Sequence, residues 1–248
     1  MKIDRPVWSA GALLCPQQFQ QQARWEAWTN ERLAHLSLVH PWGVAAVAFD
    51  QETLRLGKLK ATRLCLRMPD GTLIDTDQVD RLPSALELTQ LLSSDVQDTT
   101  VLLALPLEQA NGNNCLLDDS KVERPTRYRQ DWRKVQDLYE GEAQQIGVLE
   151  HVLSLRLAHD DNADYLTCPI VRLVRDGQGA WGLDDTYVPP LLDFAAHPGL
   201  LAQLDNLLTQ LAAKRQRLMG LRRESNQRMA DFAVADVSLF WLLTALNT

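Results

Sequence analysis

The chain has 248 residues, of which 46% are hydrophobic and 23% are charged, and its formal net charge is −7. This length allows one large domain or two modest ones, each with a buried core, and the composition is that of a globular protein. The acidic balance argues against general binding to nucleic acid or to an anionic membrane surface.

The first predicted element is a helix that follows a loop beginning at Trp8. Pro16 suits the first helical position, because its missing N–H would have no partner there. A short glutamine run broken by Phe19 predicts a polar helix face, and the helical pattern continues to Leu36. The first six residues lack the apolar core of a signal peptide, so we expect the chain in the reducing cytoplasm with free thiols.

The middle of the chain has the pattern of short strands separated by turn signals. Pro69-Asp70-Gly71 and Asp176-Gly177 each predict a hairpin turn, and Thr99–Leu107 predicts a strand buried on both faces. The other predicted strands are Trp42–Phe49, Thr62–Met68, Thr72–Thr76, Arg127–Leu138, Ile146–Ala158, Leu166–Val174 and Ala180–Leu183. Such a series, without long helices between the strands, indicates an antiparallel sandwich or barrel.

Val188-Pro189-Pro190 predicts the end of this β region, because two adjacent prolines interrupt both helix and ladder. We therefore expect an α+β, multidomain chain. Residues 1–188 would form an antiparallel β-sandwich with an N-terminal loop and helix, and residues 191–248 would form a long helical region.

The stretch from Gly199 to Phe232 carries a heptad pattern, preceded by Pro198 and Gly199 as start signals. Lys214, Ser225 and Arg228 interrupt its apolar positions. The basic residues of this stretch predict a solvated helix face, with a phosphate-binding surface as the alternative. By spacing alone the helix packs either within its own domain or against copies of itself. The apolar positions are Leu200, Leu204, Leu207, Leu211, Leu218, Leu221 and Phe232.

The last apolar run, Phe232–Leu246, is too short to span a bilayer and carries Asp236, so we expect a buried helix and no membrane insertion. Because Val237–Leu246 is apolar nearly all round, it needs partners on every side. We expect these partners from a longer protein and from other subunits.

No motif for catalysis, metal or cofactor binding stands out. The four cysteines are far apart, and the five histidines form no metal-binding motif. Gly177–Gly182 matches G-x-G-x-x-G, but no helix follows it, so a hairpin is the better interpretation. The sequence predicts no enzyme and no cofactor.

Several motifs resemble the TssK family of type VI secretion baseplate subunits. The first is an N-terminal segment, Trp8-Ser-Ala-Gly11-Ala-Leu-Leu-Cys-Pro16 followed by Gln17–Gln22. Further motifs follow in the family's order along the whole chain. The others are His40–Val44, Pro69–Thr72, Leu166–Pro169, Leu173–Asp176, Arg222–Glu224 and Ala230–Trp241.

The resemblance implies a trimer with a β-sandwich "shoulder" like that of phage receptor-binding proteins, a helical "neck" and a C-terminal "head". In the family the shoulder docks on a wedge of TssF and TssG, and the head contacts the membrane complex of TssJ, TssL and TssM. This chain is expected to end within the neck. The implied location is the cytoplasm, at the baseplate associated with the inner membrane.

The resemblance also implies site residues. Five N-terminal residues match the family pattern and are expected to bind a partner: Trp8, Gly11, Pro16, Gln17 and Phe19. The alternative is that Trp8 and Phe19 fill the core. The heptad leucines are expected to form the trimer seam.

We expect a non-enzymatic adaptor that joins a baseplate wedge to a membrane assembly. The alternative is a phage-tail-type module that binds a ligand or receptor through the sandwich loops.

Overall fold

The computed structural model describes all residues except 1–2, 117–123, 140, 227–240, 243 and 246–248. The chain divides into two compact units, Met1–Ala196 and His197–Thr248. Within the described residues no helix is both long enough and apolar enough to cross a membrane.

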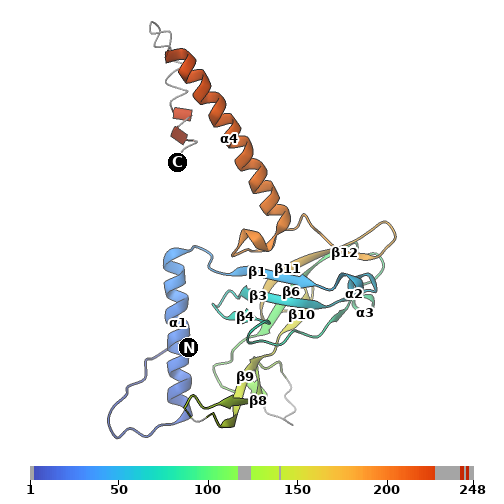
Figure 1. Ribbon diagram of the computed structural model, residues 1–248. Coiled ribbons are helices and arrows are strands. Elements are labelled where there is room, and N and C mark those ends of the chain that lie inside the picture. Colours follow the sequence, from blue (N-terminus) through green and yellow to red (C-terminus); the bar gives the residue numbers. More distant parts are fainter. Residues whose placement is uncertain (1–2, 117–123, 140, 227–240, 243, 246–248) are drawn as a thin grey trace. The chain divides into compact units, whose positions relative to one another are not determined.

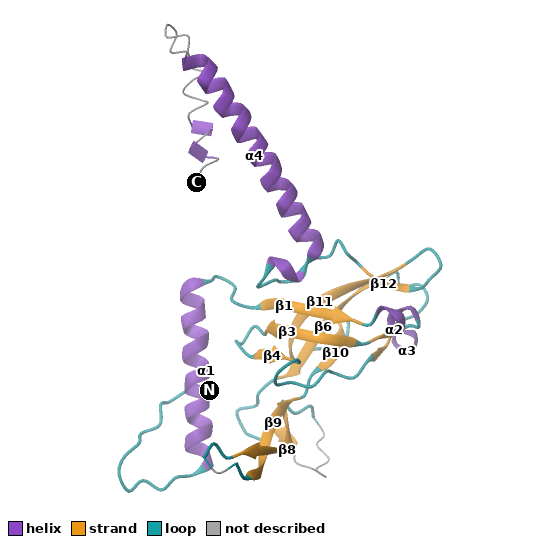
Figure 2. Cartoon of the chain, in the orientation of Figure 1, coloured by secondary structure: helices purple, strands orange, loops and turns teal. Residues whose placement is uncertain are grey.

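The first unit is built from one long N-terminal helix and mainly antiparallel sheets with short helices between strands, so the predicted α+β class is confirmed (Figures 1 and 2). In chain order its elements are α1 (Pro16–Ser37), β1 (Gly43–Phe49), α2 (Gln51–Arg55), β2 (Lys58–Leu59), β3 (Ala61–Arg67), β4 (Leu73–Asp75), β5 (Leu86–Glu87), α3 (Leu88–Leu91), β6 (Asp98–Pro106), β7 (Cys115–Leu116), β8 (Tyr128–Gln136), β9 (Ala143–His151), β10 (Ser154–Leu157), β11 (Tyr165–Arg175), β12 (Trp181–Leu183) and the 3-10 helix η1 (Phe194–Ala196).

Two sheets share one hydrophobic core. The order is β1-β3-β4 in one and β10-β6-β11-β12 in the other. Leu64 of β3 and Leu103 of β6 are both fully buried in the same cluster. Each buried leucine contributes roughly 2 kcal/mol relative to exposure. This common core holds the two sheets together.

The central strand β6 has the burial expected from its sequence. It lies between β10 and β11, and its side chains at Leu103, Ala104 and Leu105 are all fully buried. Successive residues of a strand point to opposite faces. Both faces of β6 are therefore covered at this end, as predicted.

Both predicted hairpins are present. β3 pairs with β4 around Pro69-Asp70-Gly71, and β11 pairs with β12 around Asp176-Gly177. The N–H of Asp176 donates to the carbonyl of Ala180 at 2.9 Å, so the glycine motif at 177–182 is a hairpin turn. Gly71 has φ +86, a conformation that suits glycine.

One predicted strand is divided. The expected strand Ile146–Ala158 forms β9 and β10, which belong to different sheets, because β9 pairs with β8 whereas β10 pairs with β6. The chain changes sheets at Val152–Leu153. The strands of the first unit are mainly antiparallel, as expected, while β7 pairs with β8 in parallel and Val44 forms an isolated parallel bridge with Leu191.

The second unit contains α4 (Pro198–Asn226). The expectation that Pro198 and Gly199 precede the helix is wrong, because α4 begins at Pro198. His197 caps this start: its Nδ1 accepts a hydrogen bond from the N–H of Leu200 at 3.0 Å. Most of the predicted apolar helix Val237–Leu246 lies outside the described residues.

Candidate protein-binding surfaces

The N-terminal segment folds back along α1 and is held there by polar and aromatic contacts. Gln21 Nε2 donates to the carbonyl of Asp4 at 2.9 Å. The guanidinium of Arg5 lies 4.7 Å from the centroid of the Trp25 ring, a cation–π distance. The segment therefore forms one surface with the helix.

Trp8 and Phe19 contact each other at this surface. Their ring centroids are 5.7 Å apart with an interplanar angle of 53°, and the side chains are 50% and 57% exposed. The alternative that they fill the core is therefore wrong: the two tilted rings contact each other in an exposed segment outside the sandwich. A rigid aromatic pair of this kind is a common anchor for a protein partner.

The other three predicted partner-binding residues shape the turn into α1. Gly11 has φ +78, Pro16 is the first residue of the helix, and Gln17 is exposed. The side chain of Gln18 accepts a hydrogen bond from the N–H of Cys15 at 3.0 Å, which closes the helix N-terminus. The structure thus brings all five residues into one exposed segment.

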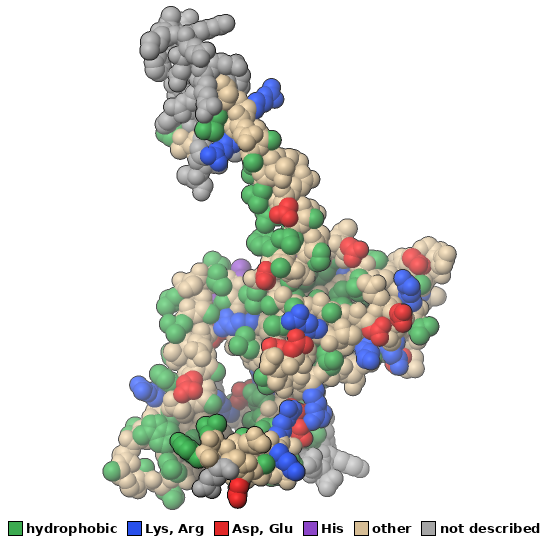
Figure 3. All heavy atoms as spheres, in the orientation of Figure 1, with side chains coloured by type: hydrophobic (Ala, Val, Ile, Leu, Met, Phe, Trp, Pro, Cys, Tyr) green, Lys and Arg blue, Asp and Glu red, His purple; other side chains and the backbone are tan. Residues whose placement is uncertain are grey.

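α1 is attached to the sandwich by ion pairs and leaves its apolar side uncovered. Arg24 pairs with Glu108 at 2.5 Å, and Glu31 pairs with Arg67 of β3. No residue of α1 is buried, and a hollow of about 330 Å³ lies beside Trp28, Leu33 and their neighbours. Figure 3 shows hydrophobic side chains gathered over this region. The exposed large apolar residues of this surface are Val7, Trp8, Leu13, Leu14, Phe19, Trp28, Leu33, Leu36, Leu38 and Val39. Such concentration indicates a binding face.

α4 carries the predicted apolar stripe on a helix whose described side chains include none that is buried. Leu207 is 52% exposed and Leu211 is 37% exposed, while Leu200, Leu204 and Leu218 are partly covered. The side chain of Leu221 and all of Phe232 lie outside the described residues. Figure 3 shows apolar side chains along this helix. Within the described part, the stripe is open to a partner.

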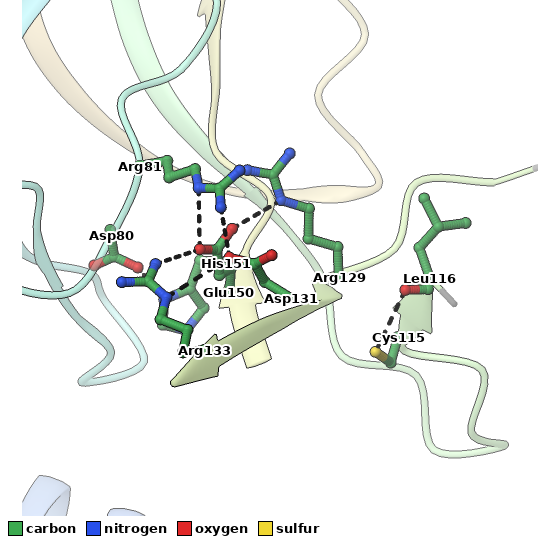
Figure 4. A network of polar contacts seen from close by, with 9 residues as sticks. All are labelled: Asp80, Arg81, Cys115, Leu116, Arg129, Asp131, Arg133, Glu150 and His151. Atoms are coloured by element: carbon green, nitrogen blue, oxygen red, sulfur yellow. Dashed lines mark hydrogen bonds and ion pairs between the residues drawn. The ribbon is translucent and has the colours of Figure 1, made fainter. Parts of the chain in front are cut away.

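A charged cluster at the base of the β8–β9 ribbon has no counterpart in the sequence predictions. The Glu150 carboxylate, 3% exposed, accepts from Arg129 Nε at 3.0 Å and from Arg133 Nη2 at 2.5 Å, and Arg81 Nε lies 3.1 Å away. Figure 4 shows the guanidiniums converging on it. A buried carboxylate needs such partners to stay ionised. The cluster therefore fixes the ribbon on the Arg81 segment.

Asp131 completes this arginine cluster, and Asp80 anchors the ribbon separately. Arg81 donates to Asp131 at 2.5 Å, and His151 Nδ1 lies 2.8 Å from Asp80. The hydrogen bond from the backbone N–H of Trp132, together with the charges of Arg81 and Arg133, holds the pKa of Asp131 below its usual value. The alternation Arg129-Asp131-Arg133 was the only sequence signal of this cluster, since alternate strand residues share a face.

Within the described ranges, no group of three or more His, Cys, Asp and Glu side chains is arranged to hold a metal ion. The acidic turn after β10 uses its side chains internally. Asp160 accepts from the N–H of Leu157 at 3.0 Å, and Asp161 accepts from the N–H of Ala163 at 3.1 Å.

The comparisons with known proteins identify one family. The profile of the family described as "Bacterial Type VI secretion, VC_A0110, EvfL, ImpJ, VasE" matches residues 18–248. The type VI secretion baseplate component TssK1 of Pseudomonas aeruginosa PAO1 is 30% identical over 223 residues, covering 88% of this chain and 48% of the relative. The chain thus spans about half the length of this curated relative.

Similar solved structures belong to the same family. A chain of a TssK–TssF–TssG baseplate subcomplex is 49% identical with a TM-score of 0.87, covering 99% of this chain and 77% of that one. A chain of a type VI secretion baseplate complex is 53% identical with a TM-score of 0.89, covering 100% and 55%. TssK from EAEC, bound to nanobody nb18, is 51% identical with a TM-score of 0.78, covering 92% and 75%. The resemblance found in the sequence motifs is confirmed: the chain belongs to the TssK (VasE) family of type VI secretion baseplate components.

Proposed function

We propose that the chain is a non-enzymatic structural component of the baseplate, and that its first unit docks on a wedge of TssF and TssG. The observation that carries this proposal is the backbone match, at a TM-score of 0.87, to a chain from a TssK–TssF–TssG subcomplex.

The docking surface in this proposal is the exposed N-terminal segment together with α1. Trp8 and Phe19 supply paired aromatic rings, while Gly11, Pro16 and Gln17 set the path of the segment that presents them. Aromatic anchors in exposed, well-supported positions supply most of the binding energy of protein interfaces. The ion pairs of Arg24 and Glu31 hold the helix in place behind them.

Self-association is assigned to α4. Its leucine stripe is exposed or half-buried in the described residues, and each leucine buried at a threefold seam would contribute roughly 2 kcal/mol. We propose a homotrimer in which Met1–Ala196 is a phage-receptor-like shoulder and α4 is the start of a neck. The prolines after Val188 predict the division near residue 188, and the first compact unit of the structure ends at Ala196.

We also propose that the assembly lies at the cytoplasmic baseplate beside the inner membrane. We propose that the full-length protein links this baseplate to TssJ, TssL and TssM through a C-terminal head.

Co-purification tests the docking proposal. The tagged chain is co-expressed with its cognate TssF and TssG, and we expect both to be retained. The double substitution Trp8→Ala, Phe19→Ala should reduce retention at least tenfold, because it removes the aromatic anchor while leaving the core intact. Leu56→Ala, at a side chain 82% exposed in a different part of the first unit, is the matched control.

Loss of retention in the control variant but not in the aromatic variant would contradict the docking surface. If the wild-type chain retains neither TssF nor TssG and instead binds a specific glycan on an array, the baseplate proposal is wrong.

A further inference from the structure

The β8–β9 ribbon has an open backbone edge along β9. Two hydrogen bonds fix its register: Asp137 N–H donates to Glu142 O at 2.8 Å, and Val152 N–H donates to Arg127 O at 3.0 Å. Hydrogen-bonded pairs alternate along an antiparallel ladder. The even-numbered residues of β9 therefore bond to β8, and the odd-numbered residues, Ala143, Gln145, Gly147, Leu149 and His151, direct their N–H and C=O groups outward.

This edge is exposed and lacks the usual protection. Among the described residues, no strand pairs with the outer side of β9, and Ala143, Gln145, Gly147 and Leu149 are all exposed. Natural edge strands are blocked by lysine, proline or a bulge. From Ala143 to Leu149 there is no charged residue, no proline and no register shift against β8.

The other edge of the same ribbon differs. β7 covers its start, where Cys115 pairs with Tyr128 and Leu116 pairs with Arg129. By the same alternation, Lys134 lies at an outward-facing position further along β8. A lysine on the edge disfavours pairing with another chain. Of the two edges of the ribbon, the edge along β9 is therefore the one that can accept an added strand.

The side chains on the two faces of the ribbon determine which types of side chain an added strand would place on each face. On one face, Gly147 lies against the side chains of Gln130 and Trp132, the Trp132 side chain is 52% exposed, and Leu149 is 61% exposed. On the opposite face lie Arg129 and Arg133. An added strand would therefore place apolar side chains on the first face and acidic side chains on the second.

The charges on the arginine face favour acidic side chains in the added strand. On the arginine face, the three guanidiniums of Arg81, Arg129 and Arg133 are about half exposed, and among the described residues they meet two carboxylates, those of Asp131 and Glu150. One more carboxylate would balance the group. The buried pairing of Glu150 keeps the ribbon fixed, so a partner strand meets a preformed edge and loses little entropy in ordering it.

We propose that the edge of β9 is a strand-addition site, which binds an extended segment of alternating apolar and acidic residues contributed by the TssF–TssG wedge. Main-chain hydrogen bonds to Gln145, Gly147 and Leu149 would supply affinity, and the two faces would supply specificity. This inference rests on the proposed docking function and adds a second contact, separate from the aromatic pair.

The test compares proline substitutions on the two edges. Gln145→Pro removes an outward N–H and blocks strand addition, but leaves the ladder to β8 intact because that N–H does not bond to β8. Lys134→Pro does the same on the opposite edge and is the matched control. We expect Gln145→Pro to reduce retention of co-expressed TssF and TssG at least tenfold, and Lys134→Pro to change it less than twofold.

Hydrogen–deuterium exchange of the wild-type complex provides a second readout. The amides of Gln145, Gly147 and Leu149 should exchange at least tenfold more slowly in the complex than in the free chain. If the wild-type chain retains the wedge but Gln145→Pro retains it equally well and these amides are not protected, strand addition is wrong and docking stands. If the wild-type chain retains no wedge, both proposals are wrong.

Discussion

Arg127 joins three parts of the first unit through one buried guanidinium. Its Nη2 donates to Asp70 at 2.6 Å and to Thr72 at 2.7 Å, and its Nη1 donates to the carbonyl of Pro106 at 3.2 Å. The turn after β3, the end of β6 and the start of β8 are thereby connected. Burial opposes ionisation of Asp70, but the charge of Arg127 and hydrogen bonds from Thr72 set its pKa below the usual value.

This pair makes stability depend on pH. Because the pKa of Asp70 is lower in the folded state, its contribution is present above the unfolded value of about 3.9 and is lost as the pH falls through the folded value. Asp70→Asn should lower the free energy of unfolding at pH 7 by about 1.5–3 kcal/mol, since it weakens hydrogen bonds to a buried charge. The difference from wild type should shrink below pH 4, as measured by urea unfolding.

Asp77→Asn serves as the control, because Asp77 pairs with Arg63 where both side chains are about half exposed. Such surface pairs contribute about 0–1 kcal/mol. An Asp70→Asn effect that stays constant from pH 7 to pH 3 would contradict the ion-pair explanation.

Cys168 should be the least reactive of the four thiols, because burial disfavours its charged form. It is fully buried in the core, and burial raises its pKa to about 12. Since only the thiolate reacts with disulfide reagents, Cys168 should remain unlabelled at pH 8 in the folded chain. Mass spectrometry after labelling should show modification at Cys168 only once denaturant is added; rapid labelling of the native chain would place this thiol outside the core.

At the scale of elements, the helices α1 and α4 share one property. Neither has a buried side chain among its described residues, yet both carry large apolar groups. An amphipathic helix of this kind gains its stability from packing more than from propensity. Their apolar sides are therefore the surfaces where we expect partners.

For α4, the substitution Leu211→Asp should convert a trimer to a monomer or an aggregate, because it places a charge in the apolar seam. Gln210→Asp, one residue away on the same helix and off the stripe, should leave the mass unchanged. Light scattering measures the mass in solution. An unchanged mass for Leu211→Asp would contradict the proposal that the leucines of α4 form the trimer contact.

At the scale of the molecule, the buried core formed by the described residues lies in the first unit. The cluster runs from Val44 to Trp181, all within Met1–Ala196. The second unit, in its described part, contributes no buried apolar residue to it.

We therefore expect residues 1–196 to fold alone. Their melting temperature, followed by circular dichroism, should lie within a few degrees of that of the whole chain, while their mass in solution should be that of a monomer. Failure of this fragment to give a cooperative transition would show that α4 supports the core. A trimeric fragment would move self-association away from α4.

Local patterns in the sequence determined most of the longer strands, both hairpins, the two long helices and the family, but not the short strands β2, β5 and β7. Turn residues and side-chain periodicity act over a few positions, so Pro69-Asp70-Gly71 and the leucines of α4 are visible without a fold. Tertiary structure alone decided that Trp8 and Phe19 contact each other outside the core. It also decided that the segment Ile146–Ala158 divides into β9 and β10, which belong to different sheets. It also brought Arg81 to Asp131, 50 residues away in sequence, because pairing at such distances depends on how the sheets close. The open edge of β9 is of the same kind, since an edge exists only where the fold places no neighbouring strand.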